Sequence, residues 1–419
     1  DGSDGATGAQ GDKGDTGATG ASGVAGSVTE LTDALVEDNS IYIGNDPSAT
    51  TDNALYNVAI GTTALGALTT GDKNTAIGYG TLTSNTTGTE NTGVGYQALN
   101  SNSDGQLNTA IGHRALRENT TGDSNTAVGD YALASNTTAR DNTAIGREAL
   151  FSNSTGAYNT AVGRAALAAN TIGYYNTATG YRALYNNTTG FLNTAVGYSA
   201  LNSNTSGYHN LAAGYRALQN NITGHQNTAI GFESLKANTT GNYNVAVGEA
   251  SLHTNQSGWY NTALGMDTLK DLYEGTYNTA IGKSALENNY SGSENTSVGA
   301  YSLENLYDGK YNTAAGMKAL QYVSSGGYNA AIGYQAGYTI TTGTYNTAIG
   351  YQSGPVYEDG NVSNTTAIGN GAIVTVSDKI RLGNTSVTVI EGQVAFSNAS
   401  DRRLKKDIVD TRYGLNTIL

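Results

Sequence analysis

The stretch that decides the fold is residues 227–243, which read NTAIGFESLKANTTGNY. The same 17-residue pattern occurs eighteen times within residues 57–363, with the Asn that begins each unit spaced by 17 residues from Asn57 to Asn346. With this Asn as position 1, the consensus is N-T-A-I/V-G-x-x-A-L-x-x-N-x-T/S-G-x-Y. Loops tolerate changes of length, whereas stacked coils with equivalent residues above one another do not. The repeat therefore predicts an all-β parallel β-solenoid, or β-roll, of 17-residue coils.

The consensus also predicts what each coil contains. Two short strands are expected, one at N-T-A-I-G and one at A-L-x-x-N, with Gly corners that supply positive φ. Position 4 (for example Ile60) and position 9 (for example Leu65) are expected to fill a thin core. Position 12 is Asn in twelve units and a large apolar or aromatic residue in the other six, which indicates a buried site. Internal Asn ladders, in which each amide bonds the next, would explain that choice.

Three features predict a homotrimer. Gly occupies every third position from residue 2 to residue 26, so residues 1–27 have the pattern of a collagen triple helix rather than of a flexible Gly-rich linker. Positions 3 and 8 are small in almost every unit, which suggests the close approach of another chain. A core this thin makes a marginal monomer, so folding is expected to be coupled to trimerisation.

The repeats are flanked by two shorter segments. Residues 28–56 are expected to form a transition or neck, in which residues 29–36 form either one or two helical turns or a loop. The repeat register ends near residue 364, where NTTAIG carries one inserted residue. Residues 364–400 are expected to form a β cap or distal tip, with strands at 380–382 and 387–390.

Composition excludes several classes of function. The net charge of −13 disfavours nucleic-acid binding, and the absence of Cys excludes disulfides and thiolate metal sites. No apolar run is long enough for membrane insertion, and the four His fall at unrelated repeat positions, so neither a metal nor another cofactor is expected. Because residue 1 lies inside a Gly triplet, we expect the native N-terminus to lie upstream.

Tyrosine is unusually frequent, with 29 residues against 4 Phe and 1 Trp. It recurs at positions 17 and 6, for example at Tyr243, Tyr260 and Tyr277. Two interpretations are open. Such rows can form structural ladders between coils, which we favour, or they can stack against host glycans through the ring faces.

Residues 57–363 resemble the NxAIGxxA coils of trimeric autotransporter adhesin heads, the YadA-like left-handed β-roll, although each coil here is three residues longer. That resemblance implies a trimeric surface fibre built from stacked coils.

A second resemblance lies at the C-terminal end, where residues 400–408 read SDRRLKKDI. This stretch is similar to the start of the intramolecular chaperone domain of phage tail spikes and fibres, the endosialidase-type or peptidase S74 family, whose pattern is S-D-x-R-L-K-x-D-I. The resemblance implies that residues 401–419 begin such a domain, which assembles the trimer and then cuts itself off. Ser400 would be the nucleophile and Lys405 its base, with cleavage before Asp401.

The sequence therefore predicts a homotrimeric phage tail fibre on the virion tail or another extracellular surface, which binds a glycan or protein receptor of the host cell. Other tail or appendage proteins are expected to contact the missing N-terminus. A bacterial cell-surface adhesin or appendage, or the fibre of a contractile injection system, is the alternative. A polysaccharide-degrading tailspike would need paired carboxylates in a cleft, and none interrupts the uniform repeats. The chain is thus not expected to be an enzyme, apart from single-turnover self-cleavage.

Overall fold

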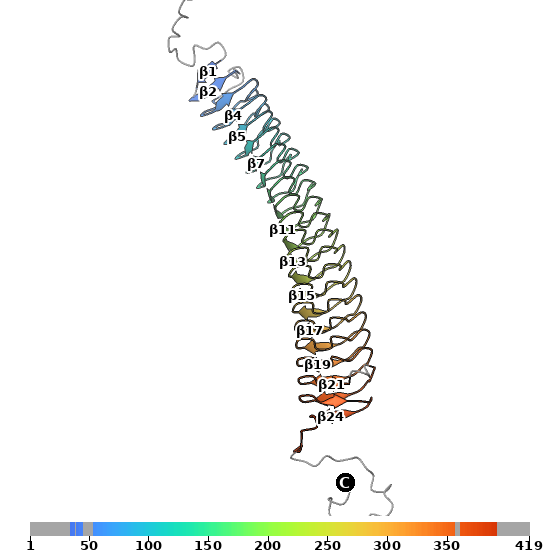
Figure 1. Ribbon diagram of the computed structural model, residues 1–419. Coiled ribbons are helices and arrows are strands. Elements are labelled where there is room, and N and C mark those ends of the chain that lie inside the picture. Colours follow the sequence, from blue (N-terminus) through green and yellow to red (C-terminus); the bar gives the residue numbers. More distant parts are fainter. Residues whose placement is uncertain (1–33, 38, 45–52, 357–360, 392–419) are drawn as a thin grey trace, which may run out of the picture.

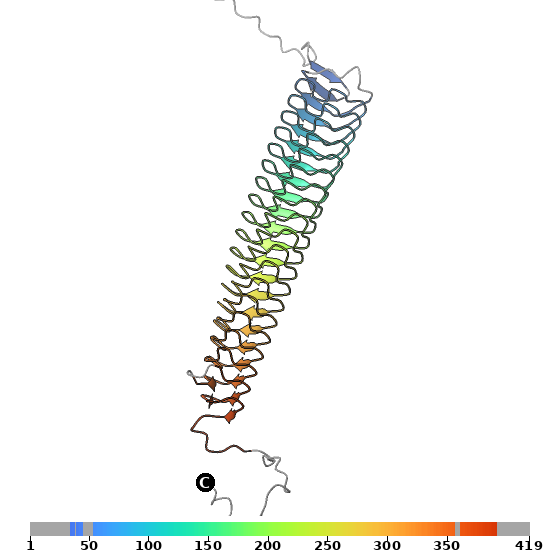
Figure 2. The same cartoon turned by 90° about the vertical axis from the view of Figure 1, so that its right-hand side faces the viewer.

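The computed structural model describes residues 34–37, 39–44, 53–356 and 361–391. They form one elongated stack of coils with a row of short strands along it (Figures 1 and 2). This confirms the prediction of an all-β parallel β-solenoid with 17-residue coils. No helix occurs in the part of the chain that the structure describes.

Each repeat contributes one strand of three residues, at positions 2–4. These strands are β3 (Val58–Ile60), β4 (Thr75–Ile77), β5 (Thr92–Val94), β6 (Thr109–Ile111), β7 (Thr126–Val128), β8 (Thr143–Ile145), β9 (Thr160–Val162), β10 (Thr177–Thr179), β11 (Thr194–Val196), β12 (Leu211–Ala213), β13 (Thr228–Ile230), β14 (Val245–Val247), β15 (Thr262–Leu264), β16 (Thr279–Ile281), β17 (Thr296–Val298), β18 (Thr313–Ala315), β19 (Ala330–Ile332) and β20 (Thr347–Ile349). Each pairs in parallel with the strands one coil away, so that equivalent residues face each other along the whole row.

The predicted second strand, at A-L-x-x-N, is wrong for the first seventeen repeats, and the last repeat has only the two-residue strand β21 (Gly354–Pro355) in that segment. In the first seventeen the segment forms turns, although its backbone still bonds the next coil, as from Leu99 N–H to the Ala115 carbonyl at 3.0 Å. The reason is local conformation. Gln97 at position 7 and Leu99 at position 9 have φ of 55° and 51°, which a β-strand does not allow.

This conformation also explains why position 9 is Leu. The sixteen Leu at this position all have φ between 49° and 55°. Positive φ is unfavourable for any L-residue and worst for β-branched ones, so Ile and Val are excluded where Leu is tolerated. In the last two repeats the position is Gly337 and Gly354, again at positive φ.

Position 5 requires Gly for two reasons at once. Gly197, for example, has φ of 131°, and a Cβ added there would lie 2.4 Å from the Gly214 carbonyl oxygen of the next coil. Coils at this corner therefore stack closely, backbone against backbone.

The core prediction is right for position 9 and wrong for position 4. Leu65 and its equivalents are buried, but Ile60 is 40% exposed. The interior partners of Leu are the small residues at positions 3 and 8, such as Ala59 and Ala64, which are fully buried within the chain's own coils. They are thus not contact residues for another chain. Alternation along the strand explains this, because positions 2 and 4 face outward when position 3 faces inward.

Two columns of Asn run through the interior. In the first Asn column (position 1), the side-chain oxygen accepts both the backbone N–H and the Nδ2–H of the next Asn, as Asn57 does from Asn74 at 2.9 and 3.2 Å. In the second Asn column (position 12), Nδ2 donates to the preceding amide oxygen, as from Asn102 to Asn85 at 2.8 Å. The predicted ladder at position 12 is confirmed, while the column at position 1 was not anticipated.

Further strands extend the stack at both ends. β1 (Ala34–Glu37) pairs antiparallel with β2 (Ser40–Ile43), which pairs in parallel with β3. Strand β1 contradicts the predicted helical turns for residues 34–36.

At the other end, β22 (Thr366–Ile368) pairs with β20, and β24 (Ile380–Leu382) pairs with β22. β21 (Gly354–Pro355) and β23 (Ile373–Val374) form a separate pair. The strand predicted at 380–382 is therefore present, whereas residues 387–390 form none.

Candidate functional site

The predicted self-cleavage residues Ser400, Asp401 and Lys405 lie outside the described residues, as do residues 1–27 with their Gly triplets. The site geometry that the structure does provide lies on the surface of the coils.

The first surface feature is the strand face, the outward side of β3–β20 and β22 that carries positions 2 and 4. Position 4 forms a row of Ile, Val, Leu and Ala in which Thr179 is the single polar residue. Many of these side chains are substantially exposed, including Ile77 at 38% and Ile332 at 50%. A long exposed row of this kind, almost entirely aliphatic, is typical of an interaction surface.

The second feature is a set of aromatic columns. At positions 17 and 6, rings one coil apart lie nearly parallel, with centroids 4.6–5.4 Å apart and interplanar angles of 9–18°. Tyr260 is stacked on both sides, by Tyr243 at 4.6 Å and by Tyr277 at 5.2 Å. Loss of water around the Tyr260 hydroxyl, together with its two neighbours, raises the pKa of Tyr260 above its usual value. The ladder interpretation of the Tyr rows is confirmed.

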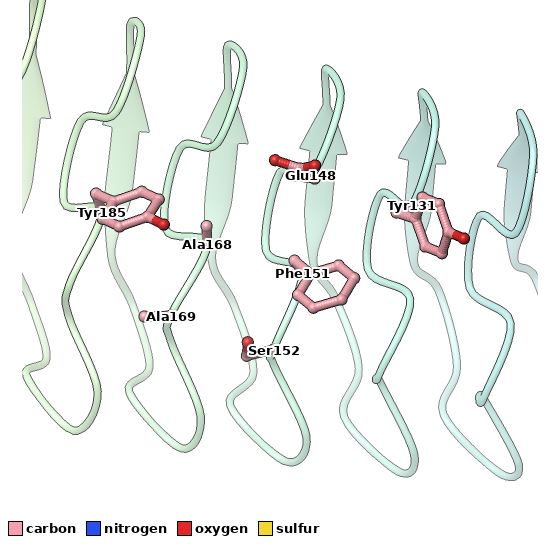
Figure 3. A pocket seen from close by; sticks show the side chains of 7 residues that line it. All are labelled: Tyr131, Glu148, Phe151, Ser152, Ala168, Ala169 and Tyr185. Carbon is pink, nitrogen blue, oxygen red and sulfur yellow. The ribbon is translucent and has the colours of Figure 1, made fainter.

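The third feature, called here the groove, is a cavity of about 490 Å³ on the segment that runs in front of the strands in Figure 3. Its lining residues come from four consecutive coils and are Tyr131, Glu148, Phe151, Ser152, Ala168, Ala169 and Tyr185. Phe151, Ala168 and Tyr185 occupy position 10 of successive coils, so that two aromatic rings border an Ala. The groove exists because the middle coil has only small side chains there.

The contacts around the groove differ from those of the aromatic columns. Phe151 meets Tyr131 edge-on, with centroids 6.0 Å apart and an angle of 63°. The Arg182 guanidinium lies 5.1 Å from the centroid of the Tyr185 ring. The Glu148 carboxylate accepts a hydrogen bond from Arg147 Nη2 at 3.0 Å. The groove thus combines an apolar floor, aromatic borders and a carboxylate at its rim (Figure 3).

A cluster of charges surrounds Glu233. Its carboxylate contacts Lys236 Nζ at 2.9 Å, His253 Nε2 at 3.3 Å and Arg216 Nη1 at 3.6 Å. Partial burial acts to raise the pKa of Glu233, but the hydrogen bonds from Lys236 and His253 outweigh it, so the pKa is lowered. All of these groups are paired in one ionic cluster, which favours a stabilising role over a catalytic one.

Neither a metal centre nor a membrane-spanning helix was found in the described ranges. No three His, Asp or Glu side chains there are grouped so that they could hold a metal ion. No helix with the length and apolar character needed to span a bilayer is present there either.

Sequence reasoning missed the groove, although a signal for it is present. The run Ala165-Ala166-Leu167-Ala168-Ala169 places Ala at positions 7, 10 and 11 of one coil, a combination that no other repeat has. An aromatic residue stands at position 10 of the coils before and after it. A comparison of the residues at position 10 from one coil to the next, in place of a consensus, would have shown the gap at Ala168.

Comparison with known proteins gave no match to any protein-family model, and no curated protein matches the chain.

Proposed function

We propose that this chain is one strand of a homotrimeric extracellular fibre, a phage tail fibre that extends from the virion tail and attaches to the host-cell surface. The observation that carries the proposal is the exposed aliphatic row of the strand face, which spans coil after coil with Thr179 as its single polar residue. Two further copies of the chain, parallel and in register, would cover this row along its full length.

Burial energetics support assembly through this face. Covering the exposed part of one Ile or Val contributes roughly 1 kcal/mol, and the row repeats this gain at every coil. The small residues at positions 3 and 8 are buried inside each chain and are not available to contact another chain. The strand face is therefore the proposed interface in their place. The Gly triplets of residues 1–27 favour three parallel chains over an antiparallel pair.

The assignment to a phage tail rests on residues 400–408. Their resemblance to the start of the peptidase S74 chaperone domain favours a tail fibre over a bacterial surface adhesin or the fibre of an injection system. In this proposal the Ser400 hydroxyl attacks the carbonyl carbon of the Ser400–Asp401 peptide bond and gives its proton to Lys405. The C–N bond then breaks, the Asp401 amine leaves with that proton, and water hydrolyses the ester that forms. Release of the downstream domain leaves a locked trimer. Upstream sequence discriminates the alternatives, because a virion-attachment domain and an outer-membrane anchor differ in composition.

Assembly is tested by measuring the mass of the purified full chain by sedimentation equilibrium. We expect three times the chain mass of 43.1 kDa. Replacing Ile111, Ile145 and Ile230 together with Asp should release monomers. The matched control places three Asp at the exposed position-14 residues Thr121, Thr155 and Thr189, and should leave the trimer intact. A monomeric wild type, or equal dissociation in both variants, contradicts the proposal.

Self-cleavage is tested separately by expressing the gene with its full C-terminus, as wild type and as Ser400→Ala. A loss of mass equal to the downstream domain is expected on denaturing gels for the wild type alone. Identical sizes would reject processing but would leave the interface test unaffected.

A further inference from the structure

The aromatic rings of this chain differ in how much of each ring face they leave free. In a stacked column both faces of a ring are occupied, as in Tyr260, whose neighbours lie at 4.6 and 5.2 Å. Such a ring presents only its edge to a ligand. Phe151 and Tyr185 are different, because no other ring of the described chain stacks on either of them, and only the Arg182 guanidinium lies over the Tyr185 ring, at 5.1 Å from its centroid.

The spacing of these two rings matches the size of one further ring. Phe151 and Tyr185 belong to coils two apart, and neighbouring coils are about 4.8 Å apart, so roughly 9.6 Å separates the two positions along the fibre. Rings stacked one coil apart in this chain have centroids 4.6–5.4 Å apart. Ala168 lies between the two rings (Figure 3) and leaves a gap there, and a ring bound over Ala168 would lie beside both of its aromatic neighbours.

The rim of the groove selects among ring-shaped ligands. The Glu148 carboxylate and the Ser152 hydroxyl line it, and both accept hydrogen bonds from hydroxyl groups. The two nearby arginines are already engaged, Arg147 with Glu148 at 3.0 Å and Arg182 with the ring of Tyr185 at 5.1 Å. The chain also carries a net charge of −13, which opposes the approach of anions. A neutral ring with an apolar face and hydroxyl-bearing edges fits best.

We propose that the groove binds one pyranose ring of a neutral oligosaccharide over Ala168, in contact with Phe151 and Tyr185. The inference rests on the proposed attachment function and specifies its ligand class. The groove lies on the segment in front of the strands, away from the strand face, so it stays open when further copies cover that face (Figure 3). In a trimer every fibre would present three such sites at one level.

The test begins with the purified full chain on an array of immobilised neutral oligosaccharides of glucose, galactose and mannose, beside sialylated and uronic-acid oligosaccharides. Isothermal titration then measures the affinity for the neutral oligosaccharide retained most strongly. Phe151→Ala and Tyr185→Ala should each weaken binding roughly threefold to tenfold, the usual value of one aromatic contact. Retention of the acidic set alone, or of none, overturns the proposal.

The decisive variant is Ala168→Phe, which fills the gap between Phe151 and Tyr185 with the protein's own ring and should abolish binding. Glu287→Phe is its matched control, because it adds the same ring at position 10 of a coil remote from the groove. Equal affinity of Ala168→Phe and wild type overturns the proposal. The mass of each sample is measured in parallel. A trimer that binds no neutral sugar defeats this inference alone, and a monomer that binds one defeats the assembly proposal alone.

Discussion

Two columns of Asn run through the interior of this solenoid, and only one of them is continuous. The first Asn column extends from residue 57 to residue 346. At one end the Ser40 hydroxyl accepts a hydrogen bond from the Asn57 N–H, and at the other the N–H and hydroxyl of Thr365 donate to the Asn346 side-chain oxygen. The second Asn column extends from residue 85 to residue 255 and stops at Leu272. The side-chain oxygen of Asn255 is buried there and has no hydrogen-bond partner.

The difference follows from what each column bonds. In the first column each amide oxygen accepts the next backbone N–H, as Asn193 does from Asn210 at 3.0 Å. In the second, the backbone is satisfied without the column, as Asn187 N–H bonds the Leu184 carbonyl. A buried backbone N–H without a partner is costly, so the first column cannot be replaced by apolar residues. The second can, and six repeats use Leu, Val, Ile or Tyr instead.

The largest effect is therefore expected from breaking the first column. Asn193→Leu removes the acceptor of the Asn210 N–H and the donor to the Gly207 carbonyl, which is 2.8 Å away. We expect a loss of about 3–5 kcal/mol in the free energy of unfolding, because several buried bonds vanish and one N–H is orphaned. Urea denaturation followed by circular dichroism measures the loss, and hydrogen exchange at the Asn210 N–H locates it. A loss of unfolding free energy smaller than that of Asn187→Leu, in the second column, would refute the distinction between the columns.

Breaking the second Asn column in its middle should lower the free energy of unfolding by a smaller amount. Asn187→Leu leaves the Asn170 oxygen without its donor, whereas Asn204 keeps its bond to the Gly207 carbonyl at 3.0 Å. One new orphaned oxygen predicts a loss of about 1–3 kcal/mol, partly offset by the burial of Leu. The same denaturation experiment compares it directly with Asn193→Leu, since the chemical change is identical. Equal losses would mean that the side-chain amides, and not the backbone, set the cost.

The sequence predicted the coil and the second column but not the orientation of the strand. A constant period of 17 residues requires stacked coils, and alternation of Asn with Leu at position 12 requires burial. The prediction for position 4 was wrong because a large apolar residue was expected to face inward. Alternation along the strand only requires that position 3 and positions 2 and 4 face opposite sides, and it does not say which side is the interior. Ala59 faces inward and Ile60 outward because the thin interior accepts only a small side chain beside Leu65. The groove was missed because it depends on differences between repeats, which a consensus removes.

The surface charges around Glu233 should contribute less than either column and, unlike them, should depend on pH. Glu233→Gln removes the ion pairs to Lys236 and His253 and should cost about 1 kcal/mol or less at pH 7. The lowered pKa of the Glu233 carboxyl means that its stabilisation is fully present above the unfolded pKa of about 4.3 and is lost as pH falls through the folded pKa.

Wild type and the variant should thus converge below about pH 4. Glu249→Gln, at a Glu that forms no ion pair with any other described residue, is the control and should match wild type at pH 7. A difference between wild type and Glu233→Gln that persists at low pH would show that the carboxylate charge is not its cause.

The smallest loss of stability is expected at Asn255, the last residue of the second Asn column. The same Asn→Leu substitution removes different hydrogen bonds there than at Asn187. Asn255→Leu removes the oxygen that already lacks a partner, and it leaves the Asn238 oxygen orphaned instead. The Gly258 carbonyl keeps its bond from Asn244 Nδ2 at 2.8 Å. The number of orphaned atoms is unchanged, so the free energy of unfolding should stay within about 0.5 kcal/mol of wild type. A loss as large as that of Asn187→Leu would mean that the column acts cooperatively along its length, each amide strengthening the next, and not as a sum of separate pairs.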